Sequence, residues 1–316
     1  MLVKNKANFV EKHPIIGYTL VIIKQKEVFS MIGLLKYSRY DLLNQIFIWI
    51  LKIMPLYQHY VPNYLRRRRN VNQSKLTDIQ VIALMCWQVE LKMTVQTRFY
   101  SFLRKCVFIN GQLPERSRFN RICNRDGLII QVIRYHLIHD KVQPKFTIID
   151  SLPMPLCKPI RNFRAKIFNG LANNGYNSTK KMYYYGFKGS FEVDGNSGIV
   201  MAYTLTEASL HDIKMVKTLV NQYPCRKILA DEGYISKRLK FELDKLGIWF
   251  WTPKRKDMKP YHYNDRFLRR LRRRIETVFS GLESLFNIEN NRGRSLAGFQ
   301  TRLEQCLLVD TLRKIN

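Results

Sequence analysis

Three acidic residues are placed where they could act together. Asp150 ends a short run of β-branched and aromatic residues at 145–149, and Asp231 ends a similar run at 226–230. Each run has the composition of a buried strand. Both carboxylates are therefore expected at the carboxyl ends of strands, where side chains can converge at a sheet edge. Glu276, on a predicted helix, supplies the third carboxylate.

Carboxylate oxygens are hard ligands suited to Mg²⁺ or Mn²⁺, which keep open positions for water and phosphate. Two such ions about 3.5–4 Å apart can activate an attacking oxygen and stabilise a leaving oxygen in an in-line phosphoryl displacement. The predicted chemistry is metal-dependent phosphoryl transfer, with Asp150, Asp231 and Glu276 as catalytic residues and metal ligands.

Glu276 is part of an arginine-rich helix predicted at 266–286. Its apolar residues recur at about 100° per residue and form one stripe. The stripe consists of Phe267, Leu268, Leu271, Ile275, Val278, Phe279, Leu282, Leu285 and Phe286. Glu276 lies about 120° from the centre of that stripe, with Arg272 one turn before it and Arg269 two turns before. The alternative is an exposed glutamate that pairs with Arg272, an interaction of little energetic value at a surface.

Other residues near the three acids have competing interpretations. His211 and Asp212 follow the third predicted strand and could support the acidic site as its second shell, although a helix cap by Asp212 is the simpler alternative. Glu232 is not expected to be a ligand, because adjacent strand side chains point to opposite faces. Trp249 and Trp251 could stack on an unpaired base, but core packing is the favoured interpretation.

The charge of the chain points to nucleic acid. The 316 residues contain 54 Lys and Arg against 24 Asp and Glu, a formal net charge of +30. Such a surface repels itself unless a polyanion neutralises it, and each phosphate that is neutralised releases counterions. The hydrophobic fraction of 46% is typical of a globular protein and excludes a disordered chain.

The six cysteines stand far apart, without the spacing of a zinc site, and are predicted to be thiols in a reducing compartment. The apolar runs at 14–23 and 46–51 are too short to span a bilayer, so no membrane association is expected. We expect a cytoplasmic protein. Residues 1–30 differ in composition from the rest of the chain, and Met31 is an alternative start, so these residues need not belong to the native product.

Three regions are predicted. Residues 1–73 form a leader and a helical, basic linker, which includes four arginines at 66–69. Residues 74–140 form a helical domain whose two or three short helices have basic faces, with Arg116 and Arg118 on one of them, compatible with a helix-turn-helix-like DNA reader. Residues 141–316 form the catalytic domain.

The catalytic domain has the element order of a known α/β architecture. Strands are predicted at 145–150, 182–193 and 199–206, with hairpin-turn residues at 194–198. A helix, a strand, a second helix, a strand at 248–251 and the long helix then come in that order. This order predicts an RNase H-like mixed sheet flanked by helices, preceded by a small all-α domain.

These residues resemble the DDE transposases of bacterial insertion sequences, and within them the insertion-sequence 982 group. The similarity runs from about Ser74 to the C-terminus. Its most specific pieces are TIIDS at 147–151, YGFK at 185–188, ASLHD at 208–212, ADEGY at 230–234 and R-x-x-x-E at 272–276. Related families often place a tyrosine three residues before that arginine and a lysine seven after the glutamate. Here Arg269 and Glu283 stand at those positions, so DNA-end contacts assigned to them do not carry over.

The resemblance implies that Asp150, Asp231 and Glu276 form the catalytic triad with two Mg²⁺ or Mn²⁺ ions. It implies cleavage at the ends of a mobile element, followed by attack of the freed 3′-hydroxyl on target DNA. The expected partner is double-stranded DNA, as terminal inverted repeats and as target, with a homodimer in the active complex. The residues expected to contact DNA are Arg272, Arg269, Arg273, Lys188, Lys254, Arg255, Arg116 and Arg118.

Two alternatives remain open from the sequence. An RNase H-like metal-dependent nuclease would cut DNA without joining strands. A non-catalytic basic DNA-binding protein would use the three acids only to pair with arginines. A degenerate copy of a mobile element is a further interpretation, although all three acids are intact.

Overall fold

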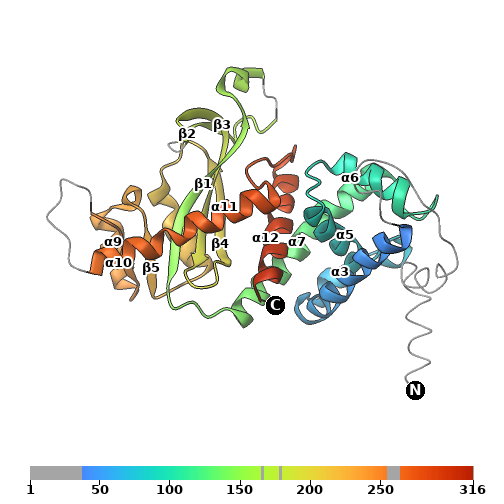
Figure 1. The fold of residues 1–316 in the computed structure, drawn as a ribbon, viewed down its shortest axis with the longest axis horizontal. Helices are drawn as coiled ribbons and strands as arrows, with labels where there is room; N and C mark the ends of the chain where they lie inside the picture. The colour runs from blue at the N-terminus through green and yellow to red at the C-terminus, as the bar shows by residue number, and fades with distance from the viewer. Residues whose placement is uncertain (1–37, 165–166, 178–179, 255–263, 316) are drawn as a thin grey trace. The chain divides into compact units, whose positions relative to one another are not determined.

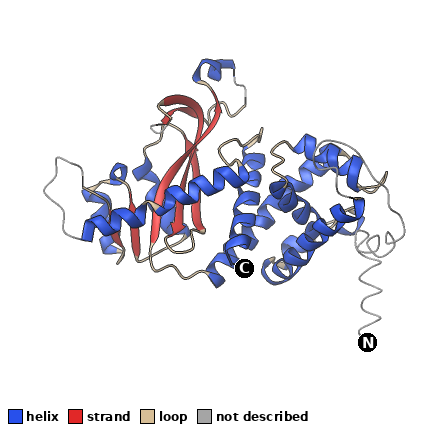
Figure 2. Cartoon of the chain, in the orientation of Figure 1, coloured by secondary structure: helices blue, strands red, loops and turns tan. Residues whose placement is uncertain are grey.

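The computed structural model describes residues 38–164, 167–177, 180–254 and 264–315. It divides into two compact units, Met1–Leu137 and Ile138–Asn316 (Figure 1). The described part of the first unit is helical, and the second combines a sheet with helices (Figure 2). The leader at 1–30 lies outside the described residues, and the predicted domain limits at 73/74 and 140/141 stay predictions.

The helices of the first unit begin where the sequence supplies capping side chains. Ser38 and Asp41 form a capping box at the start of α3 (Arg39–Tyr60), and Thr77 and Gln80 form one at the start of α5 (Asp78–Glu90). The other helical elements of this unit are α4 (Asn63–Arg66), η2 (Val71–Gln73), α6 (Gln96–Phe102), the π-helical turn η3 (Leu103–Val107) and α7 (Arg116–Lys141), which crosses the boundary between the units.

The basic run at 66–69, predicted to be a linker, makes contacts with the helices of the first unit. Arg68 forms an ion pair with Asp78 at the start of α5, and Arg125 from α7 reaches the same carboxylate at 3.0 Å. The hydroxyl of Tyr57 on α3 also donates to Asp78, at 2.8 Å. One carboxylate thus ties α3, the basic run and α7 together, a long-range pairing that local periodicity does not encode.

The sheet of the second unit has the strand order of an RNase H-like fold. Its strands are β1 (Thr147–Cys157), β2 (Asn173–Asn177), β3 (Met182–Asp194), β4 (Val200–Glu207), β5 (Lys227–Ala230) and β6 (Trp249–Trp251). β3 lies antiparallel between β1 and β4, while β1, β5 and β6 run parallel, which gives the order β4-β3-β1-β5-β6. The predicted fold class is confirmed.

β1 is longer than predicted, and the difference matters for Asp150. The predicted strand ends at residue 150, but the strand continues to Cys157 through Pro153 and Pro155. β5 pairs only with Thr147–Ile149, so the edge of β1 beyond Asp150 has no partner there on that side. A proline, which lacks an N–H, is tolerated at such a free edge. β2, which pairs with the first half of β3, was not predicted either.

Helices cover both faces of the sheet. On one face, α8 (Val216–Gln222) and α9 (Lys237–Lys245) pack onto a core that includes Ile149, Met201 and Ala230. On the other, Phe279 of α11 (Arg274–Phe286) packs on Phe191 with ring centroids 5.6 Å apart. The remaining helices of this unit are η4 (Pro159–Arg164), η5 (Asp212–Met215), η6 (Glu232–Tyr234), α10 (Asn264–Arg272) and α12 (Leu296–Ile315).

The prediction of a single long helix at 266–286 is wrong in one respect. The helix is interrupted at Arg273, where the Glu276 amide donates to the Arg273 carbonyl at 3.1 Å in a tightened turn. After the break Ile275, Phe279, Leu282 and Phe286 are buried, whereas Leu285 is 37% exposed, and Phe267 before the break is 62% exposed. Three consecutive arginines contain no helix-breaking residue, so the sequence pattern carried no signal for the break.

All six cysteines are free thiols. Among the described helices, none is long and apolar enough to cross a membrane.

Glu192 on β3 makes stability depend on pH. Its side chain is fully buried, Thr147 donates to Oε1 at 2.7 Å, and burial raises its pKa from 4.5 to about 7. The native state therefore holds a proton that the unfolded chain releases near pH 4.5, and stability falls as pH rises from there through 7. The loss is about 3 kcal/mol at most, at about 1.4 kcal/mol per pKa unit.

We predict that Glu192→Gln, which mimics the protonated side chain, unfolds at higher urea concentration than wild type at pH 8 and at a similar concentration at pH 5. Glu242→Gln, on the exposed side of α9, serves as the control for loss of a glutamate charge. Equal urea midpoints for Glu192→Gln and wild type at pH 8 would show that the buried carboxylate is neutral or solvated there.

Candidate active site

The three acids come from three separate elements that meet beside the end of β5. Asp150 lies on β1 directly after the segment paired with β5, Asp231 follows β5 itself, and Glu276 lies in the first turn of α11. Their side chains are 22%, 47% and 59% exposed, respectively. The expected convergence at the edge of the sheet is present.

One guanidinium joins all three carboxylates. Arg272, the last residue of α10, places Nη2 at 2.8 Å from Glu276 Oε1, Nη1 at 3.5 Å from Asp150 Oδ2 and Nε at 3.7 Å from Asp231 Oδ1. Its side chain is only 14% exposed. The alternative interpretation, an ion pair between Arg272 and Glu276, is therefore present too, but as one contact of a four-residue cluster.

Asp150 has the most perturbed environment of the cluster. Burial raises its pKa from 3.8 to about 7, and the carboxylates of Asp231 and Asp212 add to the rise. The Ser151 amide, which donates to Oδ1 at 2.8 Å, and the Arg272 guanidinium both lower the pKa. A carboxyl group in this balance requires a nearby cation to stay ionised at neutral pH.

The donor chemistry fits a divalent ion, but the arrangement around Arg272 is not yet a metal site. Within the described ranges, no group of three or more His, Cys, Asp and Glu side chains is placed to hold a metal ion. The guanidinium is the cation that the three acids face. Aspartate and glutamate oxygens are nevertheless the ligands that Mg²⁺ and Mn²⁺ prefer. Asp150 and Asp231 would hold such an ion together if Arg272 turned away.

Residues 141–296 match the family model described as a transposase DDE domain. The second unit of this chain is a transposase DDE domain. The predictions of a DDE transposase and of its RNase H-like catalytic domain are confirmed, and dependence on a divalent metal ion follows from the family. Membership of the insertion-sequence 982 group stays a prediction.

Similarity to individual proteins is distant. No curated protein sequence matches the chain. Among solved structures, the chain is similar to piggyBac transposase in a synaptic complex with hairpin DNA, determined by cryo-electron microscopy. The two sequences are 11% identical, the TM-score is 0.40, and the match covers 86% of this chain and 71% of the other.

His211 and Asp212, both predicted to support the acidic site of the DDE domain, have different roles. His211, not Asp212, caps η5, because its Nδ1 accepts from the Ile213 amide at 3.4 Å. Asp212 instead accepts from the Lys188 ammonium at 2.9 Å, and its charge raises the pKa of Asp150. Asp212 is therefore a fourth acid beside the cluster. Lys188, expected to contact DNA, is mostly buried and donates also to the Leu210 carbonyl at 2.8 Å.

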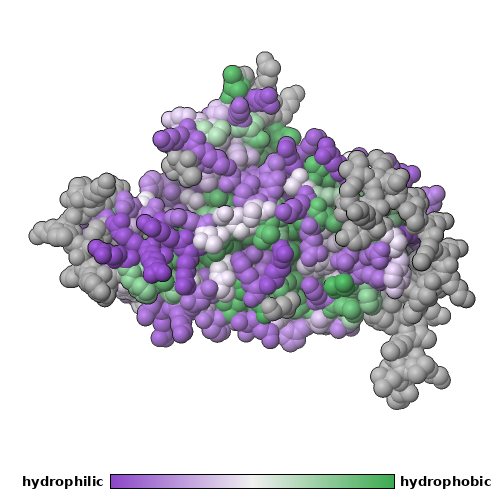
Figure 3. Space-filling model, in the orientation of Figure 1, coloured by the Kyte–Doolittle hydropathy of each residue, from purple (hydrophilic) through white to green (hydrophobic). Residues whose placement is uncertain are grey.

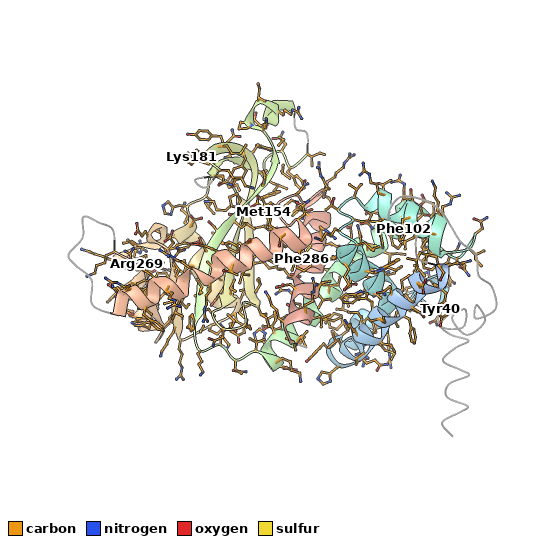
Figure 4. All side chains as sticks on the ribbon, viewed as in Figure 1. Tyr40, Phe102, Met154, Lys181, Arg269 and Phe286 are labelled. Carbon is orange, nitrogen blue, oxygen red and sulfur yellow. The ribbon has the colours of Figure 1, made fainter. Side chains whose placement is uncertain are left out.

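The other predicted DNA contacts are more accessible. Arg116 and Arg118 on α7, Lys254 after β6, and Arg273 are exposed. Arg269 donates to the Lys254 carbonyl at 3.0 Å and lies 3.8 Å from Glu232. A hydrophilic patch covers the surface over α10, where Figure 4 labels Arg269 (Figures 3 and 4). Arg255 lies outside the described residues.

The two tryptophans of β6 are not both packed in the core. Trp251 is partly buried and its indole donates to Asp265 at 3.0 Å, whereas Trp249 is 44% exposed. The favoured core interpretation is wrong for Trp249, because the edge strand β6 has a neighbour only on the β5 side and directs alternate side chains outward.

Tyr234 is a residue near the acids that the sequence analysis missed. Its side chain is 1% exposed, and its hydroxyl lies close enough to the Ser151 side chain for that side chain to lower the pKa of Tyr234. Burial raises its pKa well above 10, and Asp150 and Asp212 raise it further, so the hydroxyl is a proton donor within the field of these acids. Its position three residues after Asp231, at the end of ADEGY, was the signal available in the sequence.

We predict that Tyr234→Phe slows DNA cleavage about tenfold at saturating metal, because a buried hydroxyl donor in the electrostatic field of Asp150 and Asp212 is lost. Tyr223→Phe is the matched control. Tyr223 belongs to the same core, but its hydroxyl donates to the Val142 carbonyl at 3.2 Å. Equal rates for the two variants, with equal melting temperatures, would reduce Tyr234 to a core aromatic residue.

Proposed function

We propose that this transposase cuts DNA and joins its strands at Asp150, Asp231 and Glu276, with two Mg²⁺ or Mn²⁺ ions. The observation that carries the proposal is the convergence of three carboxylates, from β1, from the end of β5 and from α11, on one partly buried cation. Like charges are brought together in this way where a cation or a phosphoryl transfer needs them.

The residues of the chain would divide the work. Asp150 and Asp231, from two strands distant in sequence, would hold the metal ions, with Glu276 completing the set. When bound, the ions would activate the attacking oxygen and stabilise the leaving oxygen. A metal ion competes with the Arg272 guanidinium for the same oxygens. We therefore expect Arg272 to turn to a DNA phosphate, which a guanidinium binds with two parallel hydrogen bonds.

The surface supports DNA as the substrate. Arg266, Arg270 and Arg273 are exposed beside the cluster, and Lys254 lies at the end of β6. In the first unit, Arg116 and Arg118 project from the first turn of α7, so we propose this unit as a second DNA contact.

We propose that the bound duplexes are the element's terminal inverted repeats and the target. Both steps, water attack at the ends and 3′-hydroxyl attack on target DNA, are phosphoryl transfers that one site can perform. Joining two ends calls for a homodimer in the active complex. We place the reaction in the bacterial cytoplasm, on the nucleoid, where thiols stay reduced.

Cleavage and joining of a labelled duplex that carries the element's end sequence tests the proposal. We predict that wild type cuts and joins with Mg²⁺ or Mn²⁺, while Glu276→Gln binds the duplex but loses at least a hundredfold in both rates. The matched control is Glu242→Gln, because Glu242 is a partly exposed glutamate on α9 that also pairs with an arginine one turn before it, Arg238, in addition to Lys217.

The outcomes separate the alternatives. Cutting without joining by wild type would identify a nuclease, and binding without either step would identify a DNA-binding protein. If Glu276→Gln cuts as fast as Glu242→Gln, Glu276 is only the ion-pair partner of Arg272.

Metal affinity is predicted to depend on pH. Because the pKa of Asp150 is about 7, the carboxyl group carries a proton below that pH, and a metal ion must displace it. Mn²⁺ affinity, measured by electron paramagnetic resonance of the free ion, should fall by up to roughly tenfold per pH unit below 7. Asp150→Asn should weaken binding and remove most of this pH dependence, whereas Asp244→Asn on exposed α9 should leave both unchanged. A flat profile for wild type contradicts the assignment.

A further inference from the structure

A long acid-free segment links two strands of the catalytic sheet. Between Asp150 and Glu192, residues 151–191 contain seven Lys or Arg and no Asp or Glu. The segment builds the far half of β1, η4, β2 and the first half of β3, which project together from the sheet (Figure 1). A basic stretch of this length is an electrostatic footprint for a polyanion.

The end of this projection is a two-stranded ribbon. β2 pairs with Met182–Gly186 of β3, whereas β1 reaches β3 only as far as the pair Cys157 and Tyr185. Residues 175–177 and 182–184 are therefore joined to each other alone, and we call these six residues the ribbon. A two-stranded β-ribbon has dimensions that the major groove of B-DNA admits.

The ribbon exposes an aromatic pair. Tyr176 and Tyr183 are directly opposite each other across the two strands, with ring centroids 4.9 Å apart, and they are 53% and 66% exposed. Met182 in the ribbon is 41% exposed, and Ile160 and Leu171 on the same projection are 74% and 52% exposed. Met182 lies on the opposite face of the ribbon, where Asn177 and Tyr184 are buried, so the two contacting tyrosines form the exposed apolar patch of the ribbon. An exposed apolar patch on a soluble surface can mark a binding site.

Cations flank the aromatic pair. Lys181 precedes the second strand of the ribbon and points outward (Figure 4). Lys158, directly before η4, and Arg161, on η4, are exposed. Lys180 is paired with Glu289 and so contributes less net charge. The surface view shows apolar atoms interspersed with hydrophilic ones on the projection (Figure 3).

The positive charge of the projection favours DNA over a second copy of this chain as the binding partner. A second copy of this chain would bring the same positive residues against each other, which costs energy in a self-complementary interface. A duplex offers phosphates for Lys158, Arg161 and Lys181, and sugar and base edges for the tyrosine rings. The phosphates release counterions as they are neutralised, which favours binding.

We propose that the ribbon inserts into a groove of the DNA duplex, with Tyr176 and Tyr183 against the groove wall and Lys181, Lys158 and Arg161 on the flanking phosphates. This inference rests on the proposed function, since it assigns a DNA contact to a transposase. From Phe191, the strand partner of Asp150, to Tyr183 is eight residues along β3, or at most roughly 26 Å at 3.3 Å per residue. The contact should lie within about eight base pairs of the cut.

The test measures binding apart from cleavage. The full chain and a Tyr176→Ala/Tyr183→Ala variant are titrated with a fluorescent duplex, without divalent metal, at several salt concentrations. We expect the double variant to bind at least tenfold more weakly with its melting temperature unchanged. Lys181→Gln should lower the slope of log affinity against log salt by about one. Phe241→Ala, an exposed aromatic on α9, is the control and should bind as wild type does.

Footprinting locates the contact. Hydroxyl-radical protection should be lost in the double variant over a few base pairs within eight of the cut, and elsewhere be kept. The proposal is overturned if the variants keep the DNA affinity and the protection pattern of the wild type. It is also overturned if the variants change the oligomeric state of the protein and leave its DNA affinity unchanged. If the wild-type protein never cuts DNA but the ribbon variants bind DNA more weakly than it does, the ribbon proposal is supported and the catalytic proposal is rejected. If the wild-type protein binds and cuts DNA and the ribbon variants bind it equally well, the catalytic proposal is supported and the ribbon proposal is rejected.

Discussion

Three carboxylates can occupy one place in this structure only because a cation lies between them. The Arg272 guanidinium contacts Asp150, Asp231 and Glu276 at 3.5, 3.7 and 2.8 Å. Without it, burial and the neighbouring acids would leave Asp150 more strongly protonated, since both raise its pKa. Arg272 ends α10 one residue before the helix break, so the cation sits where two helices and two strands meet. The acidic site therefore depends on one side chain beside the helix break.

The short length of β5 gives the site its shape. Because β5 ends at Ala230, the edge of β1 is open from Asp150 onward, and the chain after β5 can turn through η6 beside it. The same opening accommodates Pro153 and Pro155, which could not lie in the middle of a sheet. It also brings Tyr234 into the core close to the acids. The register of the pairing places the two aspartates together, because Asp150 and Asp231 each directly follow the last pair, Ile149 and Ala230.

Much of the fold could be predicted, because strand and helix periods are local. The succession of five of the six strands along the chain follows from short patterns, and so do the positions of Asp150 and Asp231. The Asp194–Gly198 turn, where the Asp194 carboxylate accepts from the Ser197 amide at 2.8 Å, follows in the same way. The features that were missed depend on distant partners. The continuation of β1 through prolines requires knowing where β5 ends. β2 has asparagine and glycine in place of most strand formers, and the pairing of Arg68 with Asp78 joins the basic run to the start of α5. The central place of Arg272 follows only from tertiary structure, since sequence showed no more than a pair one turn apart.

The net charge of +30 understates how basic the surface is. Several acidic side chains are buried in the protein and at most 5% exposed: Asp126, Glu192, Glu304 and Asp310. Asp78 and Asp212 are held by arginine or lysine. An acid used in this way no longer offsets the exposed arginines of α10 or the lysines of the projection. A duplex that neutralises these cations also relieves their mutual repulsion, so DNA binding and folding are coupled in the same direction. Charge supplies affinity without sequence preference, so discrimination between DNA ends must come from shaped elements such as the ribbon and the helices of the first unit.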